Sequence, residues 1–173
     1  MSLHIIIDGY NLIRQSNNLS SLDRQDMQQG RETLIDMLAA YKKMKAHRIT
    51  VVFDGTEAPL HSLQRDRRKG ISILFSHNGE TADAVIKKMA RRERQKALVV
   101  SSDLEIVQSA ASSGAATISA DEFERKLEIS IYTNGIETDR DGNRGWKPTT
   151  KKKGPSRRLS KRQRTNRAKI RKL

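Results

Sequence analysis

Carboxylate side chains stand directly after short apolar segments at three places in the sequence: Asp8 after residues 3–7, Asp54 after residues 49–53 and Asp103 just after residues 97–100. Carboxylate oxygens without histidine or cysteine suit hard cations such as Mg²⁺ or Mn²⁺. Several carboxylates crowded together repel one another, and a bound cation supplies the missing charge. Such ions clamp a phosphodiester and activate water. The pattern therefore predicts metal-assisted hydrolysis, although an Asp at the end of a strand also fits a turn or helix cap.

Further polar residues lie close to these acids in the sequence. Asn11 comes three residues after Asp8, and Glu80 and Asp83 flank Thr81. Thr81 is a predicted helix N-cap, and the helix dipole favours acids nearby, so a purely structural role is open for both acids. Asp83 is the stronger functional candidate because it lies one turn inside an otherwise apolar helix face. Glu80 fits a cap and a metal ligand equally well.

The elements that must position these residues alternate between apolar segments and helical patterns. The apolar segments are residues 3–7, 49–53, 71–75, 97–100 and 115–118. They are continuous rather than alternating, which is typical of buried parallel strands. Helical spacing between them predicts a parallel sheet with helices on both faces. Ligands bind such sheets at the carboxyl ends of the strands, where the acids stand. Residues 54–70 are expected to form a loop or a short edge crossover.

The charge of the 173-residue chain is divided unevenly along its length. Residues 1–143 carry 20 basic and 20 acidic side chains, whereas residues 144–173 carry 14 Lys and Arg and no acid, which accounts for the whole net charge of +14. We expect one domain over residues 1–132 and a Gly- and Pro-containing linker over 133–155. We expect a basic tail over 156–173 that is disordered, or helical on binding RNA.

A cationic tail predicts attraction to a polyanion, and phosphate contacts of this kind depend strongly on salt. The candidate RNA-binding side chains are Arg65, Arg67, Arg68, Lys69, Lys151, Lys152, Lys153, Arg157, Arg158, Lys161, Arg162 and Arg164. The first four follow the Asp54 strand end, and the others lie in the linker and the tail.

Composition excludes several classes of protein. The chain has no cysteine, so disulfide frameworks, thiolate zinc sites and cysteine nucleophiles are absent. No apolar segment reaches the ~18–20 residues of a membrane span, and residues 3–7 are too short for a signal-peptide core. We therefore expect a cytoplasmic protein without a membrane partner. Three Phe, three Tyr and one Trp disfavour modules that stack bases on aromatic platforms.

Four motifs in this order resemble a known family. They are Asp8-Gly9-Tyr10-Asn11, Val51-Val52-Phe53-Asp54-Gly55, Glu80-Thr81-Ala82-Asp83 and Val100-Ser101-Ser102-Asp103. Over residues 1–132 the series resembles the NYN domain, in its YacP-like branch, which is related to PIN nucleases. The resemblance implies a three-layer α/β/α sandwich whose five-stranded parallel sheet has the order 3-2-1-4-5. Strands one and four are neighbours in that order, so Asp8 and Asp103 are expected to face each other.

The resemblance also implies a metal-dependent endoribonuclease. Asp8, Asn11, Asp83 and Asp103 match family positions for metal and phosphate binding, and Asp54 matches a motif acid. We expect a Mg²⁺- or Mn²⁺-bound water to hydrolyse single-stranded RNA. Asp8 and Asp103 would be the principal ligands, Asp83 would complete the site, and Asn11 would position a ligand or the phosphate. Asp54 and Glu80 are further candidate ligands.

The cellular partner is less defined by the resemblance. A similar branch of the family cuts messenger RNA on the ribosome, so ribosomal or messenger RNA is the expected partner, with the basic tail as an anchor. The alternative is a non-catalytic RNA-binding or ribosome-associated factor on an NYN platform. The acid set disfavours that alternative, because a pure binder gains nothing from carboxylates beside phosphates. The sequence leaves the oligomeric state open.

Overall fold

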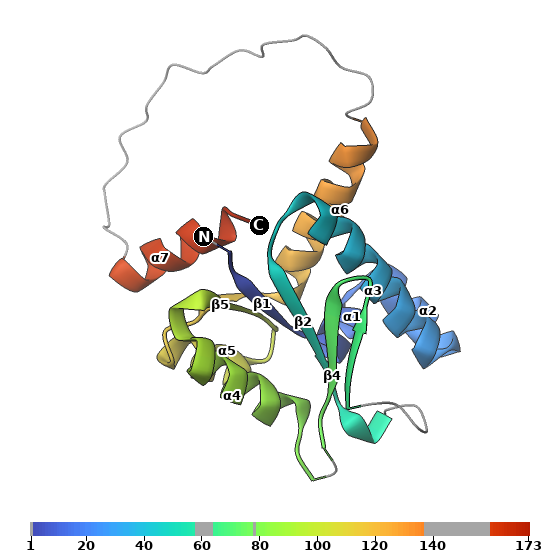
Figure 1. Ribbon diagram of the computed structural model, residues 1–173, viewed down its shortest axis with the longest axis horizontal. Coiled ribbons are helices and arrows are strands. Elements are labelled where there is room, and N and C mark those ends of the chain that lie inside the picture. The colour runs from blue at the N-terminus through green and yellow to red at the C-terminus, as the bar shows by residue number, and fades with distance from the viewer. Residues whose placement is uncertain (1, 58–63, 78, 137–159) are drawn as a thin grey trace.

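A single mixed sheet organises the chain (Figure 1). The computed structural model describes residues 2–57, 64–77, 79–136 and 160–173. Its six strands have the order β3-β4-β2-β1-β5-β6. They are β1 His4–Asp8, β2 Arg48–Phe53, β3 Arg65–Arg68, β4 Ile71–Phe75, β5 Ala97–Val100 and β6 Ala116–Ile118. All neighbouring strands pair in parallel except β3, which is antiparallel to β4.

The five predicted strands and their order 3-2-1-4-5 are confirmed, since they correspond to β4, β2, β1, β5 and β6. Strand β3 was not predicted as a strand, because its sequence Arg-Asp-Arg-Arg has no apolar pattern. An edge strand tolerates such charge, which also discourages pairing with other chains. Lys69 and Gly70, both at positive φ, form the tight turn that joins β3 to β4.

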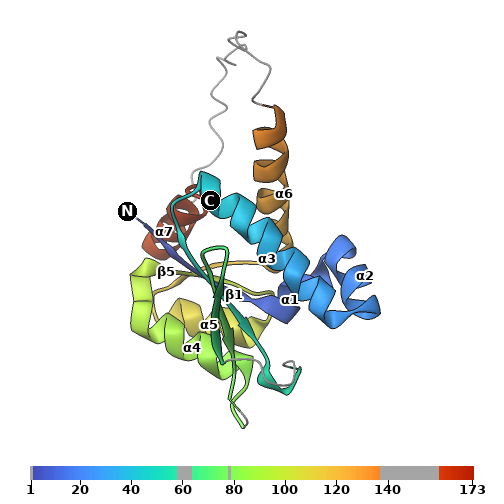
Figure 2. The same ribbon diagram turned by 45° about the vertical axis from the view of Figure 1, so that its right-hand side comes forward.

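Helices cover both faces of the sheet and complete the three layers (Figure 2). They are α1 Gly9–Gln15, α2 Asn17–Gln25, α3 Met27–Met44, α4 Ala82–Glu93, α5 Leu104–Ser112, α6 Ala120–Ile136 and α7 Lys161–Ile170. Because side chains alternate along a strand, Ile5 and Ile7 pack on the side of α3 and α6, whereas Ile6 packs on the side of α4 and α5. Within the described ranges, no helix is both long and apolar enough to cross a membrane.

The carboxyl-terminal part departs from the prediction. Helix α6 continues to Ile136, into the predicted linker, and residues 137–159 lie outside the described residues. Helix α7 then packs beside β6. The Asn166 side chain exchanges two hydrogen bonds with the backbone of Thr117: its Oδ1 accepts from the N–H at 2.8 Å, and its Nδ2 donates to the carbonyl at 3.0 Å. One amide thus occupies the open edge of the sheet.

The last residue is also held by the core. Leu173 is buried with the apolar cluster on the α3 side, Ile170 packs against that cluster, and the Leu173 carbonyl accepts a hydrogen bond from the Tyr41 hydroxyl at 3.1 Å. Residues 160–173 are therefore folded onto the domain, not disordered until RNA binds as predicted. The docking depends on Ile170, Leu173 and Asn166, and three such residues among many cations do not form a pattern from which the contact could be predicted.

Candidate active site

Asp8 is the most buried acid of the predicted site. It ends β1 with 8% of its surface exposed, and it caps α1 by accepting a hydrogen bond from the Asn11 N–H at 3.2 Å. The Ser101 hydroxyl donates to its other oxygen at 3.2 Å. Gly9 is required beside it, because a Cβ at that position would lie 2.3 Å from the Phe53 ring. Gly9 therefore lets the end of β1 pack closely against Phe53, while the carboxylate of Asp8 faces the site.

The electrostatics of Asp8 show which acids lie near it. The pKa of Asp8 is raised to about 6, mainly by burial and to a smaller extent by the charges of Asp83 and Asp103, while the hydrogen bonds from Asn11 and Ser101 act in the opposite direction. Acids that are far apart in the sequence thus share one electrostatic environment at the carboxyl edge of the sheet. The negative charges of these three carboxylates are not balanced by a cation next to Asp8 among the described residues.

Asn11 ties the two strand ends together. Its Oδ1 accepts a hydrogen bond from the Ser102 N–H at 2.9 Å, which links the turn after β1 to the turn after β5. The Ser102 hydroxyl donates to Gln15 at 3.0 Å and accepts from the Ala120 N–H at 3.1 Å. Asn11 therefore fixes the relative position of the turns that carry Asp8 and Asp103.

Asp103 lies across from Asp8 on the neighbouring strand end. It caps α5 by accepting hydrogen bonds from the Glu105 and Ile106 N–H groups at 2.7 and 3.2 Å. Its own N–H donates to the Ser101 hydroxyl at 3.1 Å. The Ser101 oxygen thus stands between Asp8 and Asp103, and the exposed carboxylate of Asp103 remains reachable from solvent.

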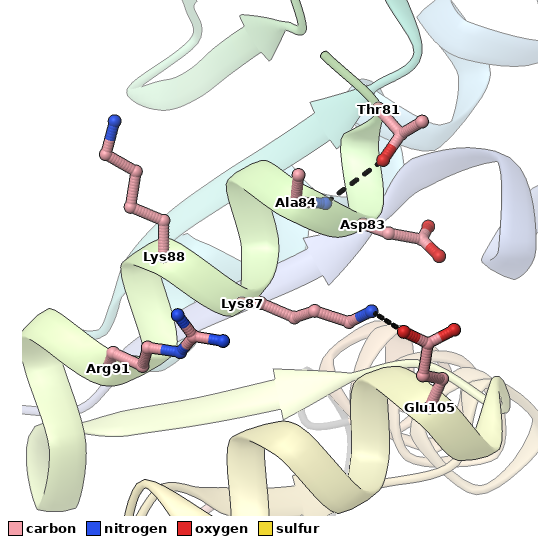
Figure 3. A pocket seen from close by; sticks show the side chains of 7 residues that line it. All are labelled: Thr81, Asp83, Ala84, Lys87, Lys88, Arg91 and Glu105. Atoms are coloured by element: carbon pink, nitrogen blue, oxygen red, sulfur yellow. Dashed lines mark hydrogen bonds and ion pairs between the residues drawn. The ribbon is translucent and has the colours of Figure 1, made fainter.

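Asp83 reaches the same region from the first turn of α4, after the Thr81 cap (Figure 3). Burial and then the charge of Asp103 raise the pKa of Asp83, and the Lys87 ammonium opposes them. Lys87, one turn further along α4, pairs with Glu105 of α5. These side chains line a pocket of about 600 Å³. The pocket combines carboxylates with a half-buried cation, which suits a phosphate ester bound through a metal ion.

The remaining two candidate ligands differ from each other. Asp54 accepts hydrogen bonds from the Thr56 N–H and hydroxyl at 2.9 and 2.7 Å, and these bonds lower the pKa of Asp54. Its charge contributes to the raised pKa of Asp83, so it lies at the rim of the same cluster. Glu80 is not among the residues that line the Asp83 pocket, and it lines the adjoining cleft on the other side of α4. The structure therefore brings Asp8, Asp83 and Asp103 together, with Asp54 nearby and Glu80 apart.

The donor chemistry of this cluster fits a hard cation held largely through water. In the part of the chain that the structure describes, no group of three His, Asp or Glu side chains is arranged to enclose a metal ion. Mg²⁺ does not need such a cage, because it keeps several waters and binds through one or two carboxylates. The available donors are carboxylate oxygens, and the repulsion among Asp8, Asp83 and Asp103 is what a bound cation would offset.

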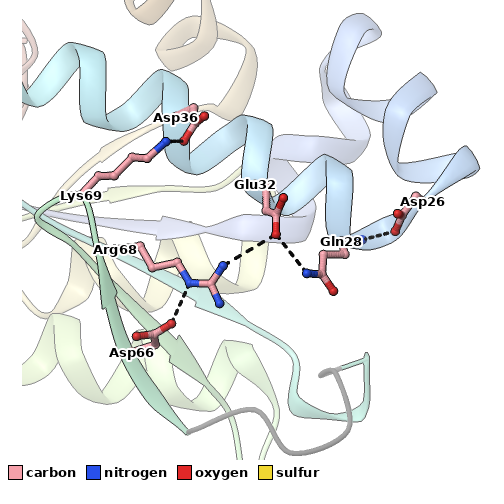
Figure 4. A network of polar contacts seen from close by, with 7 residues as sticks. All are labelled: Asp26, Gln28, Glu32, Asp36, Asp66, Arg68 and Lys69. Carbon is pink, nitrogen blue, oxygen red and sulfur yellow. Dashed lines mark hydrogen bonds and ion pairs between the residues drawn. The ribbon is translucent and has the colours of Figure 1, made fainter.

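Two cations of the predicted basic loop lie toward α3, where they pair with acids (Figure 4). Arg68 pairs with Asp66 at 2.8 Å and with Glu32 of α3 at 3.7 Å, and Lys69 pairs with Asp36 of α3. Arg68 and Lys69 therefore connect the β3–β4 hairpin to α3 through ion pairs.

Arg65 and Arg67 lie opposite Leu74 and Ser72 of β4, on the face that carries α4. Lys161, Arg162 and Arg164 are exposed on α7. Lys151, Lys152, Lys153, Arg157 and Arg158 lie outside the described residues.

Two neighbours of the acids were missed by sequence reasoning. Ser101 contacts both Asp8 and Asp103, and its only signal was its position immediately before the third strand-end motif. Lys87 acts on Asp83 from one helical turn away, and the i, i+4 spacing of the two residues was the available signal. A single lysine on an exposed helix is too common to stand out without the fold.

Comparisons with known proteins agree with this architecture. The sequence pattern of the YacP-like NYN domain matches residues 5–172. The protein YacP of Bacillus subtilis (strain 168) is 32% identical over 88 residues, which are 50% of this chain and 51% of that protein. The match thus spans about half the length of the curated relative.

Solved structures extend the likeness over more of the chain. The crystal structure of Rae1 (YacP) from Bacillus subtilis has a TM-score of 0.68 at 26% identity, with 80% of each chain covered. A tryptophan-to-leucine mutant of that protein has a TM-score of 0.64 at 26% identity, with 80% of this chain and 86% of that chain covered.

Proposed function

The chain belongs to the YacP-like NYN domain family, a nuclease-like family, and from this premise we propose that it is a metal-dependent endoribonuclease acting on single-stranded RNA. The observation that carries the proposal is the shared electrostatic environment of Asp8, Asp83 and Asp103. These acids come from three separate elements and meet at the carboxyl edge of the sheet, where β1 and β5 are neighbours. That edge is the usual ligand site of open α/β sheets.

Each residue has a defined role in this proposal. Asp8 and Asp103 would hold Mg²⁺ or Mn²⁺, and Asp83 would complete the site directly or through a metal-bound water. The bound ion would supply an activated water and neutralise charge on the scissile phosphate. Asn11 is a positioning residue, because its contact with Ser102 keeps the two ligand-bearing turns in register. Lys87 would balance the charge of Asp83 and face the phosphate.

The proposal extends to the substrate and its location. Exposed cations on α7 favour a nucleic-acid phosphate backbone as the partner. Contacts to phosphates carry no sequence preference. Messenger RNA on the ribosome is the substrate that the family resemblance suggests. The alternative is an RNA-binding factor without turnover, and the cationic carboxyl-terminal region supports it independently of the acids.

The direct test is cleavage of a labelled single-stranded RNA by the full chain with Mg²⁺, Mn²⁺ or EDTA. Asp8→Asn and Asp103→Asn are each expected to lower the cleavage rate by about 100-fold or more, since even outer partners of metal ligands contribute 10- to 100-fold. Asp36→Asn, an exposed acid on α3, is the matched control and should cleave normally. Cleavage that survives EDTA, or persists in both site variants, would contradict the proposal. RNA binding without any turnover by the unmodified protein would favour the non-catalytic alternative.

A further inference from the structure

One face of the sheet is only partly covered by helices. Along β4, Ile71, Ile73 and Phe75 are buried on the side of α3, whereas Ser72 and Leu74 on the side of α4 are half-exposed. Helix α4 packs over β1, β5 and β2. The uncovered strip between α4 and the β4–β3 edge is a cleft of about 450 Å³, which we call the α4 groove.

The groove is lined by cations that have no acidic partner among the residues that the structure describes. Arg48 comes from β2, Arg65 from β3, and Lys88 and Arg92 from α4. All four side chains belong to exposed residues, and among the described residues none of them forms an ion pair. Four unpaired positive groups around one cleft are complementary to a chain of phosphates.

One of the three acids in the groove is paired with a cation, because Asp66 pairs with Arg68. A Glu93 oxygen lies 3.5 Å from the buried Nδ1 of His4, but burial lowers the pKa of His4, so this contact leaves the charge of Glu93 uncompensated. The third acid, Glu80, stands at the end of the groove next to Thr81, which lines the pocket of Asp83. The four cations therefore outnumber the two acids, Glu80 and Glu93, whose charge remains in the groove.

Part of the groove floor is polar and offers hydrogen bonds to ribose and phosphate, beside apolar side chains of β4 and α4. Thr50 of β2 and Ser72 of β4 lie side by side in the strand register. His4 continues this floor, with its Nε2 2.8 Å from the Thr50 hydroxyl oxygen. Among the described residues that line the cleft, Phe75 is the single Phe, Tyr or Trp, so the groove has no extended platform for base stacking.

The groove is continuous with the candidate active site. Lys88 lines both the groove and the pocket that contains Asp83. Strand β2 runs beneath the groove from Arg48 toward Asp54, a distance of about 20 Å at the usual rise of an extended chain. That length accommodates several phosphates of a single strand that leaves the acid cluster.

We propose that the α4 groove binds the single-stranded RNA segment adjoining the scissile phosphate, with its phosphates contacting Arg48, Arg65, Lys88 and Arg92. The inference rests on the proposed function for its orientation toward the acid cluster. Binding in the groove needs neither the metal nor turnover, so it is measured separately from cleavage.

The test is fluorescence anisotropy of a labelled 12-nucleotide single-stranded RNA with the full chain in EDTA, across a salt series. For Arg48→Gln/Arg92→Gln we expect the Kd to rise about fivefold or more at low salt. The slope of log K against log salt should weaken by about 1.4, or about 0.7 for each lost phosphate contact. Arg24→Gln/Lys43→Gln, which removes two exposed cations from α2 and α3, is the matched control for net charge and should change the Kd less than twofold.

A second double variant, Arg65→Gln/Lys88→Gln, guards against a local folding defect in the first, and circular dichroism of each variant confirms its fold. An unchanged Kd in both groove variants would overturn the inference, as would equal weakening in the control. The same loss with a blunt RNA duplex would also overturn it, because it would indicate general electrostatics. Normal groove dependence in EDTA together with no cleavage would instead contradict the proposed function and leave the groove intact.

Discussion

Asp8 is the residue where folding and chemistry oppose each other. Its carboxylate is buried among other acids, and the pKa of Asp8 is raised to about 6. A shift of about two units from the ordinary value means that ionisation at neutral pH costs the folded state about 3 kcal/mol. A residue chosen for stability alone would be neutral at this strand end. The cost is offset when a cation binds, which links the burial of Asp8 to its proposed role.

Replacing Asp8 should therefore stabilise the metal-free protein at neutral pH. A carboxyl whose pKa is raised by folding stabilises the fold below its unfolded pKa, and this contribution is lost as the pH rises through about 6. In EDTA, the unfolding free energy of Asp8→Asn relative to the unmodified chain should increase between pH 4 and pH 7, by up to about 3 kcal/mol. Urea denaturation at each pH measures it.

Asp121 gives a control of opposite sign. The Ser119 hydroxyl and Arg125 lower the pKa of Asp121, so its contribution to stability is present at neutral pH and is lost as the pH falls. Asp121→Asn should consequently weaken the fold at pH 7 relative to pH 3. A pH-independent difference for Asp8→Asn would show that its carboxyl is not destabilised by burial in solution.

Asn11 should contribute to both stability and activity. Asn11→Ala leaves the Ser102 N–H without its acceptor, so we expect a loss of about 1–2 kcal/mol in the unfolding free energy. Because the turns of Asp8 and Asp103 then lose one of their links, with the Ser101 contacts remaining, Mg²⁺ affinity should fall as well. Isothermal titration with Mn²⁺ and thermal unfolding measure the two effects. Asn18→Ala, at an exposed position of α2, should change neither, and a normal Mn²⁺ affinity in Asn11→Ala would refute a positioning role.

At the residue scale, the sequence was informative where a motif places an acid directly after an apolar strand. Asp8 and Asp103 could be placed at one edge because parallel strands end at the same edge. The separation of Glu80 from Asp83 could not be predicted, since it depends on which side of the α4 start each side chain faces. The Ser101 bridge likewise requires the pairing of β1 with β5.

At the scale of elements, β3 and α7 show where a sequence pattern stops being informative. The central strands are continuous apolar segments, so their existence followed from the sequence pattern. Their order followed from the family resemblance alone. Strand β3 is held by backbone pairing with β4 while its charged side chains remain largely exposed. Helix α7 depends on Asn166, Ile170 and Leu173 finding partners more than 40 residues away. Neither feature leaves a local apolar period.

Asn166 should anchor α7 to the sheet. Asn166→Ala removes both hydrogen bonds to Thr117 and leaves the backbone groups of the β6 edge unpaired. We expect a loss of about 1–3 kcal/mol in the unfolding free energy and faster hydrogen exchange at the Thr117 amide. Arg164→Ala on the exposed side of the same helix should stay within about 0.5 kcal/mol of the unmodified chain. Unchanged exchange at Thr117 would mean that α7 does not protect the edge.

At the scale of the whole molecule, the docking of α7 fixes where the carboxyl-terminal cations lie on the domain. The cations of residues 161–172 do not extend freely from the domain, because Tyr41 and His47 contact the backbone of the last two residues. His47 also contacts Leu3, just before β1, so this end lies at the amino ends of the strands. The carboxylates gather at the opposite edge. The cations of α7 and the carboxylate cluster thus lie on different sides of the domain.

This placement makes the proposed RNA binding by α7 and the proposed cleavage separable by charge neutralisation rather than by truncation. Deleting α7 would remove Leu173 from the core along with the cations. The triple variant Lys161→Gln, Arg162→Gln and Arg164→Gln keeps the docking residues and should unfold within about 1 kcal/mol of the unmodified chain. In filter binding to a long single-stranded RNA, the slope of log K against log salt should weaken by about 2. Cleavage of a short RNA at saturating concentration should stay unchanged, because the acid edge is untouched. Loss of that cleavage would place the α7 cations in the catalytic site, and an unchanged salt slope would remove them from RNA binding.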